Sequence, residues 1–286
     1  MKLTLSAMTV VLVTTLLPFA PASGFPGDNG RLTYSVDNEG IFTSDPDGSD
    51  VVELSDSGSD IDPAWSADGS KIAYRCGKDV CTMKADGSDK TRVTSDISVS
   101  TGQPAWSPDG NRIAHQRFHS GELGGNVTLW IMDEDGSNAE ELTDFRSSNP
   151  AFSPDGNRIV FTRGKVGVEG IWSIRPDGTG LKVLFNETQY ISRPTWSPDG
   201  RTIAFLLQDR NKWRLWTMNR DGGDVRQIYK PSPRQINGRG LAWSPDGRYF
   251  LLRDLNGSLF RLNRDGTGMR SLHLLGMHQD WAPVLP

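Results

Sequence analysis

Short apolar runs alternate with turn-forming residues along most of the chain. The stretch from Pro194 to Phe205 has this form: Pro-Thr-Trp, then Ser-Pro-Asp-Gly, then Arg-Thr-Ile-Ala-Phe. Pro presets φ, Asp bonds back to its own backbone, and Gly adopts positive φ without steric cost, so Ser-Pro-Asp-Gly favours a tight turn. The pattern therefore predicts two short strands joined by that turn.

This strand–turn–strand pattern recurs every 40 to 47 residues. The residues at its left-handed turn position, with Asn in a degenerate first copy, are Asn29, Gly69, Gly110, Gly156, Gly200 and Gly247. A second series of Asp-Gly turns lies between them, and each of its glycines follows a Phe, Cys or Trp by six positions: Gly48, Gly87, Gly136, Gly178, Gly222 and Gly266. Four short strands at this period are typical of a propeller blade.

Six such units predict an all-β fold, a six-bladed β-propeller of four-stranded antiparallel blades. The tail from Asp280 to Val284 resembles the first strand of a unit, whereas the N-terminal copy lacks a full first strand. We therefore expect the ring to be closed by pairing of the C-terminal strand with the N-terminal blade, which leaves no open edge. A solenoid is the alternative architecture, and it would need capping repeats at both ends.

These units resemble the TolB-type, WD-like propeller repeat over residues 25–286, as found in the C-terminal propeller domain of TolB from the Tol–Pal system. The resemblance implies a bacterial, exported propeller. It carries no single function, because the fold hosts several. Some TolB-like propellers, such as oligogalacturonate lyases, are metal-dependent enzymes. A metal-assisted polysaccharide lyase or hydrolase is therefore the alternative to a non-catalytic binding scaffold.

The first segment predicts export. Residues 3–19 are largely apolar, Lys2 is the only charge, and Ala20-Pro21-Ala22 offers a small-x-small cleavage site. We expect residues 1–22 to be a signal peptide and residues 25–286 to form a single domain in the periplasm or outside the cell. An uncleaved anchor is the alternative, because the apolar run is long enough to span a membrane.

Composition narrows the choice of function. The chain has 31 Lys and Arg against 35 Asp and Glu, which gives no basic footprint for nucleic acid. It contains neither His-Glu-x-x-His nor Gly-x-Ser-x-Gly. We expect a monomer with no cofactor, no metal and no catalytic residue. The enzyme alternative depends on whether His119, His273 and His278 converge with carboxylates.

Cys76 and Cys81 stand close together in one predicted hairpin. Pairing Tyr74 with Met83 across a four-residue loop would place the two cysteines opposite each other. Export supplies an oxidising compartment. The sequence therefore predicts a Cys76–Cys81 disulfide, in which Cys81 replaces the aromatic residue of the other units.

The candidate binding surface follows from the blade geometry. Both series of Asp-Gly turns share one face of the propeller, so that face repeats. The opposite face carries hairpin loops of unequal length and links with unlike side chains: Asp60, Asp62, Gln103, Asn149, Arg193, Arg239, Asp280 and Trp281. Because the links enter the innermost strands, we expect a protein or a cell-wall component to bind at this mouth of the central channel. Two alternatives assign no binding role to this face: the differences are neutral sequence drift on solvated loops, or the protein is a scaffold without a small ligand.

Overall fold

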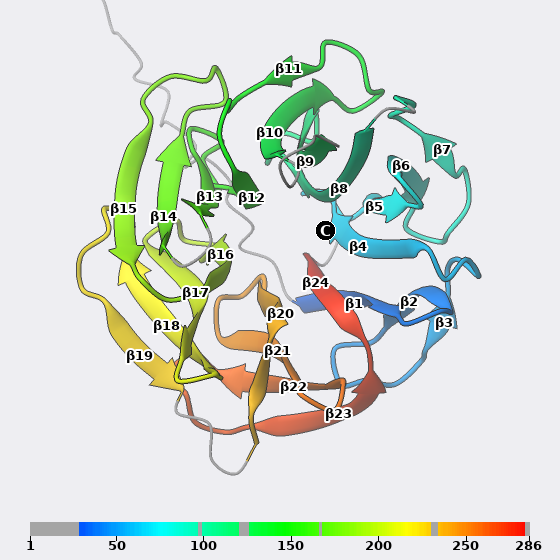
Figure 1. The fold of residues 1–286 in the computed structure, drawn as a ribbon. Helices are drawn as coiled ribbons and strands as arrows, with labels where there is room; N and C mark the ends of the chain where they lie inside the picture. The colour runs from blue at the N-terminus through cyan, green and yellow to red at the C-terminus, as the bar shows by residue number, and fades with distance from the viewer. Residues whose placement is uncertain (1–28, 97–98, 120–125, 166–167, 230–233, 284–286) are drawn as a thin grey trace, which may run out of the picture.

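The computed structural model describes residues 29–96, 99–119, 126–165, 168–229 and 234–283. These residues form β-strands arranged as sheets around a central axis (Figure 1). The predicted signal peptide, residues 1–22, lies outside this described part. Within it, no helix has the length and hydrophobicity to cross a membrane.

Four sheets contain four strands each. The first consists of β24 (Met277–Pro283), β1 (Asn29–Val36), β2 (Gly40–Ser44) and β3 (Val52–Glu53). The second consists of β4 (Asp60–Trp65), β5 (Lys71–Cys76), β6 (Asp79–Lys84) and β7 (Thr91–Arg92). The third consists of β8 (Val99–Trp106), β9 (Arg112–His119), β10 (Asn126–Asp133) and β11 (Glu140–Glu141). The fourth consists of β12 (Ser147–Phe152), β13 (Ile159–Lys165), β14 (Val168–Ile174) and β15 (Lys182–Glu187).

The remaining strands form one larger, eight-stranded sheet. Its members are β16 (Ile191–Trp196), β17 (Thr202–Asp209), β18 (Lys212–Asn219), β19 (Arg226–Tyr229), β20 (Ile236–Trp243), β21 (Tyr249–Asp254), β22 (Ser258–Asn263) and β23 (Arg270–Leu275). One residue pair, Trp213 with Ile236, joins β18 to β20. Gly238 permits this approach, because a Cβ there would collide with the Trp213 ring.

The prediction of six separate four-stranded blades is therefore wrong. The described residues form four four-stranded blades and one eight-stranded sheet. The difference arises because β18 and β20 extend far enough for the Trp213–Ile236 pair to bridge two successive sequence units. The period of the turns cannot report such a bridge, because it depends on how far two strands extend.

The two ends of the described chain share a sheet. β24 pairs antiparallel with β1, with Leu32 opposite Trp281 and Thr33 opposite Asp280. Strands β24, β4, β8, β12, β16 and β20 lie innermost (Figure 1), and each contacts the next in this order, with β20 contacting β24. The inner strands therefore surround the centre of the molecule.

The predicted Asp-Gly turns are confirmed. In the turn after β16, Gly200 has φ 65° and its N–H donates to the Ser197 carbonyl at 2.9 Å. Asp199 accepts hydrogen bonds from the Ser197 hydroxyl at 2.6 Å and from the Arg201 N–H at 3.1 Å. The same turn geometry follows β4, β8, β12 and β20.

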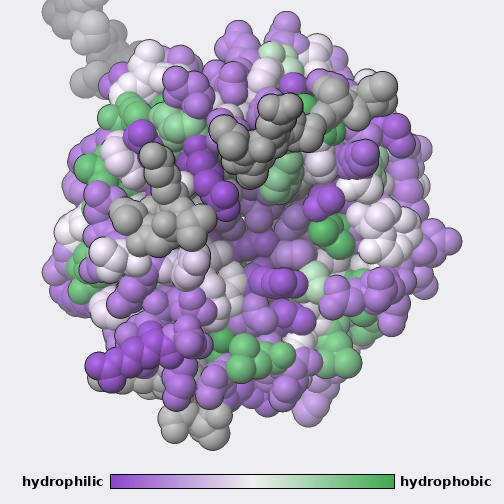
Figure 2. Space-filling model, in the orientation of Figure 1, coloured by the Kyte–Doolittle hydropathy of each residue, from purple (hydrophilic) through white to green (hydrophobic). Residues whose placement is uncertain are grey.

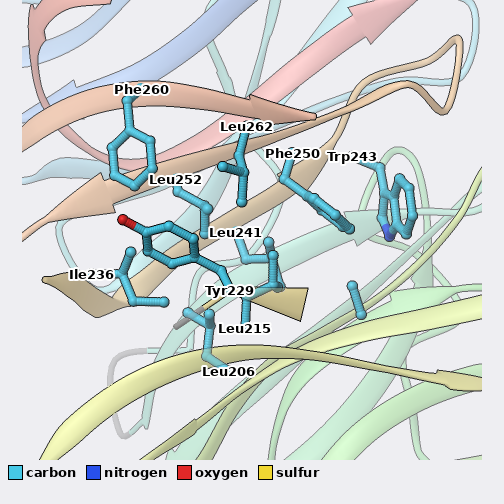
Figure 3. Close-up of a cluster of buried hydrophobic side chains, with 11 residues drawn as sticks. Leu206, Leu215, Tyr229, Ile236, Leu241, Trp243, Phe250, Leu252, Phe260 and Leu262 are labelled. Carbon is cyan, nitrogen blue, oxygen red and sulfur yellow. The ribbon is translucent and has the colours of Figure 1, made fainter. Parts of the chain in front are cut away.

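The tryptophans that precede the Asp-Gly turns pack in the core. Trp65, Trp106, Trp196 and Trp243 are each buried. Figure 3 shows Trp243 beside Phe250, with ring centroids 4.2 Å apart, in a cluster that also contains Leu206 and Leu215. Because Leu206 and Leu215 come from β17 and β18, this core joins the two halves of the eight-stranded sheet.

The structure contains the Cys76–Cys81 disulfide, with the two Cα atoms 5.8 Å apart. The predicted strand register was wrong: Tyr74 pairs with Cys81, and Cys76 pairs with Asp79. The hairpin loop has two residues because Gly77 adopts φ 65°. The bond therefore joins diagonal neighbours across the hairpin.

Candidate functional site

The inner strands share an irregularity that aims side chains at the centre. In β4 the pairing with β5 shifts register between Ile61 and Ala64, and equivalent shifts interrupt β8, β12, β16 and β24. At each shift one non-glycine residue has φ between 49° and 55°: Asp62, Gln103, Asn149, Arg193 and His278. We call these five the mouth residues. Left-handed non-glycine residues cost about 1–3 kcal/mol each and cluster at functional sites, and such bulges re-aim side chains.

The mouth residues line one cavity of about 240 Å³ between the inner strands. Further along each strand the same cavity is lined by proline, alanine and tryptophan, as at Pro63, Ala64 and Trp65. Figure 2 shows a central hollow surrounded by hydrophilic residues. The cavity thus has polar groups at one level and an apolar wall at another.

Three mouth residues meet across the centre. Arg193 Nη2 lies 3.2 Å from Asp62 Oδ1, and His278 Nδ1 lies 3.5 Å from the same oxygen. Asp62 belongs to β4 and Arg193 to β16, and β8 and β12 lie between them in the cyclic order. The Asp62–Arg193 ion pair therefore spans the central opening.

The charges at this cluster are set by burial and by neighbouring arginines. Burial raises the pKa of Asp62, but His278, Arg193 and Arg75 outweigh it and hold that pKa below its usual value. Burial lowers the pKa of His278 to about 4, and the attraction of Asp62 only partly opposes this. At neutral pH, Asp62 is therefore ionised and His278 is neutral.

Gln103 and Asn149 join two neighbouring inner strands. The Asn149 N–H donates to Gln103 Oε1 at 2.9 Å, and the Asn149 side chain donates to Thr162 at 3.2 Å. Both residues remain partly exposed. They therefore present polar groups to the cavity while they hold β8 against β12.

Three of the residues expected at the binding surface lie inside the protein or between strands. Asp60 and Trp281 are buried. Asp280 is partly buried, and its carboxylate accepts the Trp65 N–H at 2.8 Å, which links β24 to β4. Trp281 Nε1 donates to the Gly30 carbonyl at 2.9 Å. Asp280 and Trp281 also line the cavity, while their polar groups bond within the fold.

Two of the expected residues, Arg239 and Asp280, do not occupy the mouth position of their strands. Arg239 is exposed, but the mouth position of β20 is Gly240, where a Cβ would collide with Gln279. In β24 the mouth position belongs to His278, which the sequence analysis considered only as a possible enzyme residue and not at the binding surface. The signal was Trp281: it pairs with Leu32 as Trp65 pairs with Ile72, which places His278 level with Asp62.

Asp280 gives a prediction for pH dependence. Burial raises its pKa from 3.8 to about 6, so the stability it contributes is present below pH 3.8 and is lost as the pH rises through 6. Relative to wild type, Asp280→Asn should therefore gain about 2 kcal/mol in unfolding free energy between pH 4 and pH 7. Urea denaturation of both proteins at the two pH values measures this.

The opposite dependence of His278 is present in both proteins, so their difference isolates Asp280. The low pKa of His278, about 4, gives stability that is lost as the pH falls from 6.5 through that value. A difference between Asp280→Asn and wild type that stays constant from pH 4 to pH 7 would show that the carboxyl titrates normally.

The three histidines singled out for a possible enzyme do not meet. His119 ends β9 and lies 3.1 Å from Thr128, whereas His273 is exposed on β23. Only His278 lies at the mouth. No group of three or more His, Cys, Asp or Glu among the described residues could hold a metal ion.

Comparisons with known proteins match this architecture. Among solved structures, TolB from Acinetobacter baumannii is 23% identical with a TM-score of 0.76, covering 92% of this chain and 69% of that one. A putative TolB from Agrobacterium tumefaciens is 20% identical with a TM-score of 0.70, covering 86% and 90%. An oligogalacturonate lyase in complex with manganese is 13% identical with a TM-score of 0.59, covering 81% and 69%.

These likenesses establish a shared fold. A search of curated proteins finds no match. The family model described as "TolB beta propeller domain" matches residues 29–284, a range that includes every strand of the described residues. With that match and the repeated turns, the chain belongs to the TolB β-propeller domain family.

Proposed function

We propose that this chain is an exported, non-catalytic β-propeller that binds a protein partner at the mouth of its central cavity. The observation that carries the proposal is the set of five left-handed mouth residues. The backbone conformation repeats in β4, β8, β12, β16 and β24, while the side chains are acidic, amide, basic and imidazole. A costly conformation used to present unlike groups at one place suits specific recognition.

The Asp-Gly turn face and the mouth face differ in how far their side chains repeat from one unit to the next. The Asp-Gly turns repeat the same hydrogen bonds, as expected for stability. The mouth instead has an ion pair across the cavity, and the exposed Arg239 lies next to the mouth position Gly240 on β20. Departure from repetition is where binding residues concentrate on propellers and other repeat folds.

The Cys76–Cys81 disulfide supports the proposed export. Disulfide bonds persist in the periplasm and outside the cell, whereas cytosolic cysteines are kept reduced. Export also agrees with the signal-like residues 1–22. The lyase alternative draws no support from the histidines, because His119 and His273 lie away from His278.

Charge reversal at the mouth tests the proposal. Arg239→Glu should reduce the amount of a partner recovered from an envelope extract of the source organism by about tenfold or more, because it places a carboxylate on the binding surface. The matched control is Arg201→Glu, an exposed arginine on the Asp-Gly turn face. Quantitative mass spectrometry of the recovered proteins gives the comparison.

Arg193 is unsuitable for reversal, because a glutamate there would face Asp62 and disturb the fold. Equal melting temperatures for Arg239→Glu, Arg201→Glu and wild type establish that the fold is intact. Partners that are lost with Arg201→Glu and kept with Arg239→Glu would place the binding surface on the turn face and refute the proposal.

A further inference from the structure

Four arginines from different elements gather around the Asp62–His278 contact. Arg193 is paired with Asp62, and Arg75 lies close enough to Asp62 to lower the pKa of that carboxyl. Arg253 stands on β21 opposite the irregular part of β20 that contains Arg239, because the pairing shifts register between Ile236 and Leu241. Both strands contact β24, and both arginines help to lower the pKa of His278. Strands β5, β16, β20 and β21 thus bring four arginines to the surroundings of Asp62 and His278, and Arg193 itself lines the cavity.

Most of these arginines form no ion pair with a carboxylate of the protein. Among the described residues, none of the ion pairs within 4.0 Å includes Arg75, Arg239 or Arg253. Arg75 Nε donates to the Gly77 carbonyl at 2.7 Å instead. Asp62 is engaged by Arg193, so the mouth carries more positive than negative charge.

Arg253 is one arginine whose charge the protein leaves incompletely neutralised. Its Nε is buried and has no hydrogen-bond partner among the described residues. Burial lowers the pKa of Arg253, and the nearby Arg239 lowers it further, although Asp37 and Asp254 oppose the shift. Asp254 is already occupied by Arg234 at 3.4 Å and by the N–H groups of Asn256 and Ser258. A buried donor without an acceptor is what an incoming anion would satisfy.

We propose that Arg193, Arg239 and Arg253 bind the carboxylates of an acidic segment of the protein partner, with Asp62 as the positioning residue that holds Arg193. This inference rests on the proposed function and names the chemistry of its partner. Arginine binds carboxylates through paired hydrogen bonds, and the pairs are strong where water is partly excluded. Asp62 fixes the Arg193 side chain across the cavity, and Arg75 adds positive charge beside Asp62.

The surroundings favour a peptide over an acidic sugar. Leu255 directly follows the β21 segment that carries Arg253, and it is 57% exposed. Leu275, whose backbone pairs with Ser258 on β22, is 62% exposed. Two exposed leucines, one of them two residues from Arg253, suit a segment that alternates acidic and apolar side chains, whereas an acidic oligosaccharide gains little from them.

Fluorescence anisotropy with a labelled hexaglutamate peptide tests this inference directly. The full chain should bind hexaglutamate more tightly than hexaglutamine, and the affinity should fall as salt is added. The double variant Arg239→Gln/Arg253→Gln should weaken hexaglutamate binding by about tenfold or more. Arg201→Gln, on the turn face, is the matched control and should bind as the wild type does.

Three results would overturn the inference: equal binding of hexaglutamine and hexaglutamate, equal binding by the double variant and wild type, or tighter binding of an oligogalacturonate than of hexaglutamate. The last result would assign the arginines to an acidic polysaccharide. If hexaglutamate fails to bind while Arg239→Glu still loses its partner from extracts, the acidic-segment inference fails and the mouth remains the binding surface. If the partner is instead lost with Arg201→Glu, the proposed function fails as well.

Discussion

Replacing Trp281 with alanine is expected to lower the free energy of unfolding by about 3–5 kcal/mol. Trp281 lies on β24 and is only 4% exposed. Its ring packs in an apolar cluster with Leu32 of β1 and Leu251 of β21. The indole N–H donates to the Gly30 carbonyl at 2.9 Å, so alanine would also leave that carbonyl without its donor. Urea denaturation at neutral pH measures the loss.

Tyr190→Ala is the matched control, because Tyr190 is an aromatic residue that is 48% exposed. Its replacement should change the unfolding free energy by no more than about 0.5 kcal/mol. If Trp281→Ala cost as little as Tyr190→Ala, β24 would not hold its neighbours as the structure describes. The comparison therefore tests whether the last strand joins β1 and the core of β21.

Replacing Asp62 with asparagine is expected to cost about 3 kcal/mol, because it removes one partner of a buried ion pair. Asparagine tolerates the left-handed backbone of Asp62, at φ 54°, so the substitution changes charge with little backbone strain. Arg193, 3.2 Å away, would lose its carboxylate in a side chain that is 19% exposed. Urea denaturation at pH 7 gives the size of the effect.

A double-mutant cycle separates the ion pair from other effects of the substitution. Arg193→Gln in the Asp62→Asn background should cost much less than Arg193→Gln in wild type, because the two side chains interact directly. Strictly additive losses would mean that the Asp62–Arg193 pair contributes nothing to stability. In that case Asp62 could not act as the positioning residue for Arg193.

Much of the fold follows from local chemistry that a sequence displays. Ser-Pro-Asp-Gly encodes its turn within four residues, which is why the turn at Gly200 lies where expected. The buried positions of Trp196 and Trp243 follow from their fixed place before those turns. The division into sheets does not follow, because the Trp213–Ile236 bridge depends on distances in the assembled molecule.

The candidate site was predicted less completely. Pro63 marks the strand where Asp62 turns its side chain inward, and similar prolines mark Gln103, Asn149 and Arg193. Strands β20 and β24 lack that marker, so Arg239 was chosen instead of Gly240, and Asp280 instead of His278. Arg239 and Arg253 come from two neighbouring strands of one sheet, and no residue of the repeat pattern predicts that they lie close together.

The most direct test of the binding surface is site-specific photo-crosslinking. A benzoylphenylalanine placed at Arg239 should form a covalent adduct with a partner protein in an envelope extract, whereas the same group at Arg201 should form none. Both positions are exposed arginines, so the comparison changes only the face that is sampled. An adduct formed from position 201 and absent from position 239 would contradict the account, because the partner would then bind the Asp-Gly turn face.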